Sequence, residues 1–107
     1  MSTGRLAAVY VSEQNVVTKV YTPPSGKQAV CTLSVCNLNT TSVMIKIAML
    51  ANESQGVNVL DGEWIEYNFE LTPNNTYERT GLILLYPQTI SVASTDQVAA
   101  VVWGYEE

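Results

Sequence analysis

Apolar residues in this chain recur mostly at alternate positions, in short runs separated by Pro, Gly, Asn and Thr. A period of two is typical of β-strands that bury one face. No window of about eleven or more residues has a helical period. Short strands at this spacing favour an all-β, antiparallel β-sandwich of eight to nine strands, jelly-roll-like in its winding. The expected strands are residues 6–11, 16–21, 28–38, 42–50, 57–60, 63–71, 77–86, 89–93 and 97–105.

Turn-forming residues separate these runs. Pro23-Pro24-Ser25-Gly26 forms a stiff corner, because Pro cannot donate to a strand ladder and Gly can reverse the chain. Asp61-Gly62 predicts a two-residue hairpin turn, since both turn positions favour positive φ. The 107 residues are enough for one core, so we expect a single sandwich domain over residues 1–107.

The alternation also predicts which side chains face the core. Thr32 and Ser34 alternate with apolar neighbours, and Lys46 lies opposite an unbroken apolar row. The expected core residues are Cys31, Leu33, Val35, Val43, Ile45, Ile47, Met49, Ile65, Tyr67, Phe69, Leu71, Ile90 and Val92.

Three segments, residues 43–50, 82–86 and 98–103, are apolar on both faces of the expected strand. One core covers only one face, and water would not leave the other uncovered. In a short all-β protein the expected cover is another protein chain. The candidate subunit interface consists of Met44, Ala48, Leu50, Leu82, Leu84, Ala99, Val101 and Trp103.

The charge content supports hidden surface and excludes several partners. Charged residues make up 14% of the chain, against about 25% in typical soluble domains. The net charge is −5 and the five basic residues are dispersed, which argues against nucleic-acid binding and against anionic membranes. No apolar run approaches the roughly 20 residues of a membrane span. The N-terminus lacks a secretory pattern, so we expect synthesis in a cytoplasm.

Side-chain chemistry argues against an enzyme. Histidine is absent, which removes His-dependent catalysis and His-bearing zinc sites. Cys31 and Cys36 lie on opposite faces of one expected strand, about 16 Å apart, too far for a disulfide. Glu66 and Glu70 are expected on one strand face about 13 Å apart, beyond glycosidase spacing. We therefore expect no catalytic residue, no metal site and no cofactor.

Trp64 begins a more polar strand face that also carries Glu66, Asn68 and Glu70. An exposed Trp beside acids and amides can stack on a sugar ring, so Trp64 is a candidate glycan contact. Tryptophan is also a common anchor in cores and subunit contacts, and these alternatives stay open.

Four stretches carry a resemblance to a known group of proteins: RLAAVY (5–10), CTLSVCN (31–37), LILLYPQTISVAS (82–94) and VVWGYEE (101–107). In this succession of strands the chain resembles the small virion proteins encoded by tailed bacteriophages. The resemblance implies a β-sandwich without enzymatic activity, used in capsid decoration or as a tail or fibre accessory. It identifies no functional residue.

These observations lead to three hypotheses of different classes. The first is a structural component of a bacteriophage virion, made in the host cytoplasm, that decorates or cements the capsid or tail. Its partners are other virion proteins and further copies of itself, with a trimer as one option. The second is a receptor- or glycan-binding module on a tail fibre or baseplate, acting through Trp64 and Trp103. The third is a hydrolase that uses Glu66 or Glu70.

Overall fold

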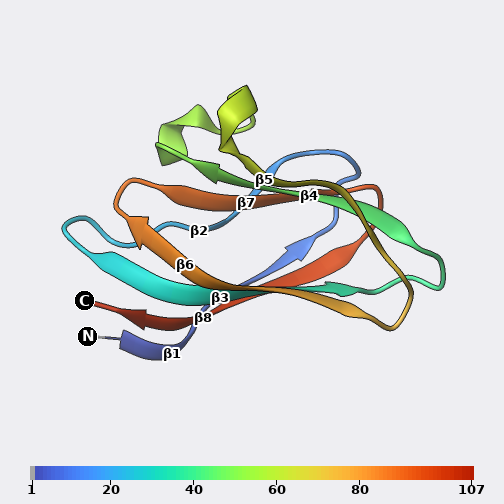
Figure 1. Cartoon of the computed structure of the whole chain (residues 1–107), viewed down its shortest axis with the longest axis horizontal. Helices are drawn as coiled ribbons and strands as arrows, with labels where there is room; N and C mark the ends of the chain where they lie inside the picture. Colours follow the sequence, from blue (N-terminus) through green and yellow to red (C-terminus); the bar gives the residue numbers. More distant parts are fainter. Residues whose placement is uncertain (1) are drawn as a thin grey trace.

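The computed structural model describes residues 2–107 and consists of two four-stranded antiparallel sheets packed face to face (Figure 1). Sheet A has the order β1-β8-β3-β6, and sheet B has the order β2-β7-β4-β5. The expectation of an all-β antiparallel sandwich is therefore confirmed. The strands are β1 (Ser2–Val11), β2 (Thr18–Tyr21), β3 (Gln28–Asn37), β4 (Val43–Leu50), β5 (Trp64–Leu71), β6 (Thr76–Leu85), β7 (Thr89–Ser94) and β8 (Val98–Glu106).

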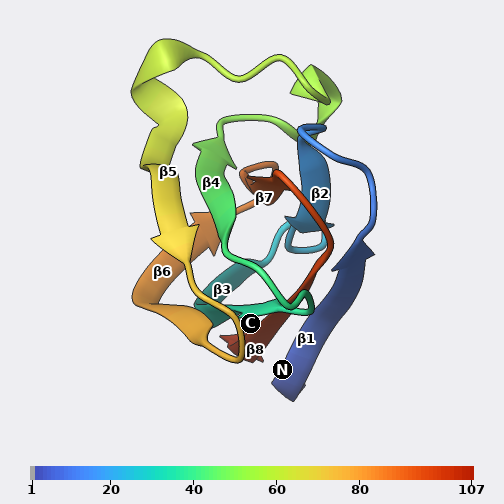
Figure 2. The same cartoon turned by 90° about the vertical axis from the view of Figure 1, so that its right-hand side faces the viewer.

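The strand pairing is nested along the chain. β4 pairs with β5, β3 with β6, β2 with β7 and β1 with β8. Further pairing of β3 with β8 and of β4 with β7 completes the two sheets. Figure 2 shows the result from the side, with β5, β4, β7 and β2 across one layer and β6, β3, β8 and β1 across the other. The first half of the chain thus pairs with the second half along its length, and the successive strand pairs lie alternately in sheet A and sheet B.

The core lies between the sheets and is built mainly from alternate residues. β3 shows strict alternation, with Cys31, Leu33 and Val35 buried, as the sequence predicted. β8 alternates in the same way over its first five residues, because it pairs with β3 along its length. The largest fully buried side chains are Leu33, Ile45, Ile47, Leu50, Leu84, Ile90, Val11, Val35, Val43, Val92, Val98 and Val102.

The expected strand at 57–60 does not form. Residues 51–63, here called the crossing segment, contain two short 3-10 helices, η1 (Glu53–Gln55) and η2 (Asp61–Glu63). Asp61-Gly62 opens η2 and does not make a hairpin turn. The reason is local hydrogen bonding: polar side chains of the segment bond to its backbone N–H and C=O groups, which then cannot pair with a neighbouring strand. Glu63, for example, accepts a hydrogen bond from the backbone N–H of Leu60 at 2.9 Å.

β5 departs most from the expected alternation. Its register against β4 shifts twice, and Asn68 has a positive φ of 57°. The extra residues rotate part of the strand, as β-bulges do. Tyr67 is consequently 58% exposed, so its expected place in the core is wrong. Phe69 still pairs with the buried Ile45 and packs its ring on Tyr77 of the other sheet, with centroids 5.0 Å apart. Because β5 is an edge strand, Phe69 is nevertheless 40% exposed and lies outside the core cluster, whereas Leu71 is buried as expected.

The same shifts separate the two candidate carboxylates of β5. Glu66 pairs with Ile47 and Glu70 pairs with Met44. Ile47 is buried and Met44 is exposed, on opposite faces of β4. Glu66 and Glu70 therefore do not share a strand face, and the prediction that they do is corrected.

Candidate functional site

The outer face of sheet A carries a broad, mostly apolar surface. Exposed fractions are 55% for Tyr10, 59% for Ile83, 52% for Leu85, 37% for Trp103 and 39% for Tyr105. No described segment of the chain lies over this face, which forms the lower side of the molecule in Figure 1. Contiguous exposed apolar surface of this kind marks an interaction site in soluble proteins.

The strand register brings these side chains into rows. Val30 of β3 pairs with Ile83 on one side and with Tyr105 on the other. Thr32 pairs with Trp103, and residues directly opposite in antiparallel strands place their side chains within contact distance. Strands from both ends of the chain thus build one surface, here called the sheet A surface. It consists of Ala8, Tyr10, Val30, Thr32, Ser34, Cys36, Ile83, Leu85, Ala99, Val101, Trp103 and Tyr105.

The predicted interface residues of β8 and β6 have different outcomes. Ala99, Val101 and Trp103 of β8 lie on the outward side, since their neighbours Val98, Ala100 and Val102 are buried. In β6, Leu82 and Leu84 face the core, at 6% and 0% exposure. Their expected place in an interface is wrong.

The phase of β6 follows from its partner strand. Leu82 pairs with Cys31 and Leu84 with Ala29, both of which are buried. Residues 82–85 are apolar without interruption, so no alternation in the sequence could indicate the phase. The outward residues of β6 are Ile83 and Leu85.

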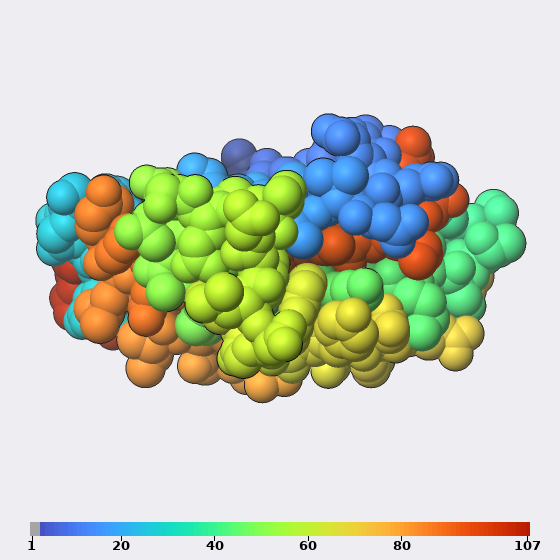
Figure 3. Space-filling view, turned by 90° about the horizontal axis from the view of Figure 1, so that it is seen from above, coloured from blue at the N-terminus to red at the C-terminus, as the bar shows by residue number. Residues whose placement is uncertain are grey.

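The outer face of sheet B is partly covered by the chain itself. Ala48 and Leu50 pair with Ser91 and Thr89, in register positions between the core residues of β4 and β7. They are nevertheless buried, at 0% and 1% exposure, and they lie outside the main core cluster. The crossing segment passes over this face, at the top of Figure 1 and as the yellow-green atoms in the middle of Figure 3. A second apolar face therefore exists on β4, but the expectation that a partner chain covers Ala48 and Leu50 is corrected.

The carboxylate of Glu63 organises the crossing segment. It accepts hydrogen bonds from the backbone N–H groups of Leu60 and Ala51, each at 2.9 Å, and from the Gln55 amide at 2.9 Å. The backbone bond from Leu60 is the largest cause of a lowered Glu63 pKa.

A second tie connects the segment to sheet B. Lys19 of β2 forms a salt bridge with Glu53 of η1 at 3.3 Å, and the Glu53 backbone N–H donates to the carbonyl oxygen of Pro87 at 3.0 Å. Asn52 caps η1 by accepting from Ser54, while the Gln55 side chain accepts from the backbone N–H of Asn52. The run Asn52-Glu53-Ser54-Gln55 has the spacing of a capping box, and this signal could have predicted the helical turn.

Beside the crossing segment, the outer face of sheet B contains a hollow of about 190 Å³. Trp64 pairs with Ala48 at its edge, and its ring packs edge-to-face on Tyr67 with centroids 5.3 Å apart. The Lys46 ammonium lies 4.6 Å from the centre of the Tyr67 ring. The hollow is lined by Asn15, Val17, Met44, Lys46, Trp64, Asn68, Ala93, Ser94 and Thr95. The predicted glycan contact Trp64 and the predicted interface residue Met44 thus both border this hollow.

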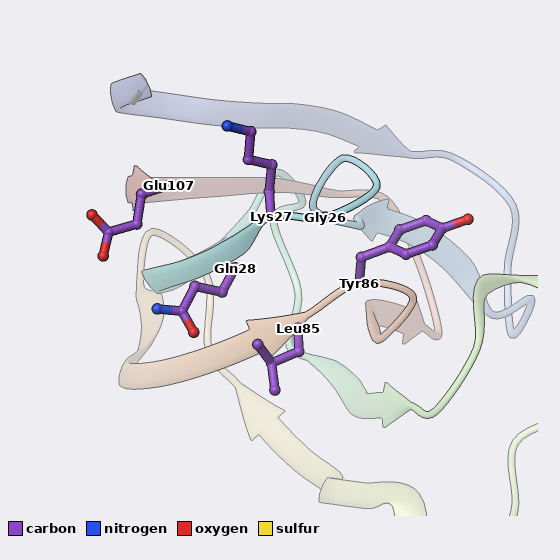
Figure 4. A pocket seen from close by; sticks show the side chains of 6 residues that line it. All are labelled: Gly26, Lys27, Gln28, Leu85, Tyr86 and Glu107. Atoms are coloured by element: carbon purple, nitrogen blue, oxygen red, sulfur yellow. The ribbon is translucent and has the colours of Figure 1, made fainter.

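A larger depression of about 320 Å³ lies where β3, β6 and β8 meet at the end of the sandwich. Its lining includes Lys27, Gln28, Leu85, Tyr86 and Glu107. Figure 4 shows that these side chains point in different directions, and among the described residues Lys27 and Glu107 form no salt bridge. The depression offers no convergent set of polar groups, so it does not form the binding site.

Reactive groups within residues 2–107 are few. No three His, Cys, Asp or Glu side chains in this range come together as metal ligands. Cys31 and Cys36 are both free, as the strand geometry predicted, and burial raises the pKa of the Cys31 thiol to about 11. No helix in the described range is long and apolar enough to cross a membrane.

Comparisons with models of known protein families, with curated proteins and with solved structures find no match.

Proposed function

We propose that this protein is a structural subunit of a bacteriophage particle that assembles through the sheet A surface. The observation that carries the proposal is the exposed apolar surface of four strands, with Ile83, Trp103 and Tyr105 in adjoining rows. Hydrophobic burial is the main driving force of protein association. A subunit that cements or decorates a capsid or tail needs such a contact and needs no catalytic group.

The size of the sheet A surface supports contact with another copy of the chain. Four strands about 4.8 Å apart, of nine or ten residues each rising about 3.3 Å per residue, span roughly 30 Å by 19 Å. Side-chain relief makes the accessible area larger than this projected area of about 600 Å². Stable protein interfaces bury about 800 Å² per partner, so one such face is sufficient for a homo-oligomer.

The charge distribution on the sheet A surface also fits assembly. The central strands β3 and β8 present Thr32, Ser34, Val101 and Trp103 outward, with no charged side chain among them. Charged residues are depleted in the centres of protein interfaces, and aromatic residues are enriched. The nearest charged residues are on the edge strands, where Arg5 of β1 pairs with Trp103 and Glu78 of β6 pairs with Ser34. A contact centred on β3 and β8 would leave these charges at its rim, where interfaces are polar.

The nested strand pairing supports a virion role by analogy of fold. Pairing of β1 with β8, β2 with β7, β3 with β6 and β4 with β5 supports the jelly-roll winding that the sequence favours. Jelly rolls occur in viral capsid proteins and in lectin domains. One fold serves many functions, so the fold alone does not carry the proposal. Self-assembly is proposed from the sheet A surface, and the bacteriophage particle is proposed from the resemblance to phage virion proteins.

Assembly is tested in solution with a matched pair of variants. Ile83→Glu places a charge on the sheet A surface, whereas Val57→Glu places one in the crossing segment, where Val57 is 60% exposed. We expect light scattering at micromolar concentration to find oligomers for the wild type and for Val57→Glu, and monomers for Ile83→Glu. A wild-type monomer, or equal oligomers in both variants, would contradict assembly through this face.

The particle assignment needs a separate measurement. Quantitative mass spectrometry of purified virions from a phage that encodes this chain should find it in many copies per particle. Absence from the virion, with an intact oligomer in solution, would remove the phage role and leave the self-association.

A further inference from the structure

The hollow beside Trp64 has features of a ligand site on a face separate from the proposed assembly surface. It lies on the outer side of sheet B between the β1–β2 loop, β4, β5 and the end of β7. Figure 3 looks onto this face, where orange-red atoms of the end of β7 are visible between the blue, green and yellow segments. Four parts of the chain that are distant in sequence thus meet around it.

Two asparagines of this hollow have unusual backbone conformations. Asn15 and Asn68 have φ values of 61° and 57°, a region that glycine occupies at lower cost. Asn is often found there because its side chain bonds locally to the backbone. Within residues 2–107, however, neither side chain makes such a bond, so local structure does not explain the choice of Asn at these positions. Backbone strain of this kind is concentrated at functional sites.

The remaining lining combines an aromatic edge with one cation. Lys46 is the only charged side chain around the hollow, and no carboxylate within the described range lies within salt-bridge distance of it. The Tyr67 ring holds its ammonium by a cation–π contact at 4.6 Å, and Tyr67 in turn packs against Trp64. The ammonium and the indole therefore both contact Tyr67, and both line the hollow.

We propose that this hollow binds a hexuronate unit, that is, a pyranose ring that carries a carboxylate. The apolar face of the sugar ring would lie against Trp64, its hydroxyl groups would bond to the amides of Asn15 and Asn68, and its carboxylate would pair with Lys46. A volume of about 190 Å³ is below the roughly 300–1,000 Å³ of sites for drug-sized ligands, which suits a single sugar unit. Because this hollow and the sheet A surface are on opposite sides of the sandwich, neither proposal depends on the other.

Fluorescence provides a direct test, because the chain has two tryptophans. In a Trp103→Phe background, Trp64 is the only indole. We expect its emission to change saturably when oligogalacturonate is added, at roughly millimolar concentration. Neutral galacto-oligosaccharides should bind at least about tenfold more weakly, equal to about 1.4 kcal/mol. Free galacturonic acid distinguishes binding of a single unit from binding that needs a polymer.

Variants then separate a ligand site from general adhesion. Lys46→Gln should remove the preference for the acidic sugar and leave the weaker neutral binding unchanged. Asn68→Gly keeps the positive φ and removes the amide, and it should weaken sugar binding several-fold with no loss of stability. Asn74→Gly is the matched control, because Asn74 also has a positive φ of 65° but lies in the β5–β6 turn, outside the hollow.

Three results would overturn the proposal: no saturable change with either sugar, an equal response to acetate at the same ionic strength, or affinity for oligogalacturonate that Lys46→Gln leaves unaltered. Each variant's thermal unfolding is recorded first. If Lys46→Gln does not fold, Lys46→Arg replaces it and should retain the preference for the acidic sugar, and loss of that preference in a folded Lys46→Arg protein counts equally against the site.

Discussion

The hydroxyl group of Tyr21 in β2 donates a hydrogen bond to the carboxylate of Glu106 in β8. Tyr21 belongs to sheet B and Glu106 to sheet A, so this bond joins two layers that meet mainly through apolar contacts. The Asn37 amide of β3 makes a second such link, donating to the backbone carbonyl oxygen of Leu71 in β5 at 2.9 Å. Burial, followed by the bond to Glu106, raises the pKa of Tyr21 above its ordinary value of 10.0. The bond is therefore strongest when the phenol is protonated.

Tyr21→Phe should destabilise the protein by about 1–3 kcal/mol, because Glu106 loses its partner in a part-buried position. Since the folded-state pKa of Tyr21 is raised, its contribution to stability is complete below pH 10 and is lost as the pH rises further. Urea denaturation at pH 7 and pH 10.5 checks both points. If the wild type and Tyr21→Phe lose stability equally at high pH, Tyr21 does not cause the alkaline loss.

The two cysteines should react differently with alkylating agents. Cys31 is buried and its pKa is raised to about 11, so little thiolate is present near pH 8. Cys36 faces outward on the sheet A surface, where it pairs with Ala99 and Thr76. Mass spectrometry after iodoacetamide treatment should find one label in the native monomer, on Cys36, and two after denaturation. Slower labelling of Cys36 in the oligomer than in the monomer would indicate that assembly covers the sheet A surface. Rapid labelling of Cys31 in the native protein would contradict its burial.

Glu63→Gln should loosen the crossing segment. The variant keeps the side-chain size but weakens the bonds to the N–H groups of Ala51 and Leu60, since bonds to a charged acceptor are stronger. Hydrogen exchange at these two amides should accelerate by roughly tenfold, while exchange in β3 stays unchanged. Because the Glu63 pKa is lowered, its stabilising effect is present above pH 4.5 and is lost as the pH falls below that value. Unaltered exchange at Ala51 and Leu60 would mean that Glu63 does not hold the segment.

Gly104→Ala should be strongly destabilising. A Cβ at this position would lie 2.1 Å from the carbonyl oxygen of Val30, and the backbone φ is +149°. We expect a loss of at least about 2 kcal/mol from overpacking and backbone strain. Gly62→Ala is the matched control, because no atom lies within 4 Å of its added Cβ. Thermal unfolding of both variants makes the comparison, and equal midpoints would show that β8 can move away from β3.

The phase of β6 is tested by two adjacent leucines. Leu84 is fully buried and Leu85 is 52% exposed. Leu84→Ala should cost about 2–5 kcal/mol, and Leu85→Ala should change the stability of the monomer by less than about 0.5 kcal/mol. Urea denaturation of the monomer measures both, and a reversed order would mean that β6 presents its other face to the core.

Much of the fold could be predicted because strand alternation is a local property. Cys31, Leu33 and Val35 alternate with Thr32 and Ser34 in the sequence, and only one phase of such a strand buries its apolar side. All eight strands of the structure overlap expected ones. The additional strand expected at 57–60 did not form because side chains bond to its backbone groups in competition with a sheet. The Gln55 amide donates to the Asn58 carbonyl oxygen, and the Glu63 carboxylate accepts from the Leu60 N–H.

The sequence by itself also determined that β4, β6 and β8 have apolar residues on both faces. Which of these residues are covered was decided only by the tertiary structure. The crossing segment folds over Ala48 and Leu50 of sheet B, while no described segment covers Ile83 and Trp103 of sheet A. The physical reason is that alternation along a strand depends only on adjacent residues. Whether an outward residue is covered depends on where a distant segment of the chain passes and on the register of the paired strands. In the uninterrupted run 82–85, pairing with β3 alone turned Leu82 and Leu84 inward and left Ile83 and Leu85 on the outer surface.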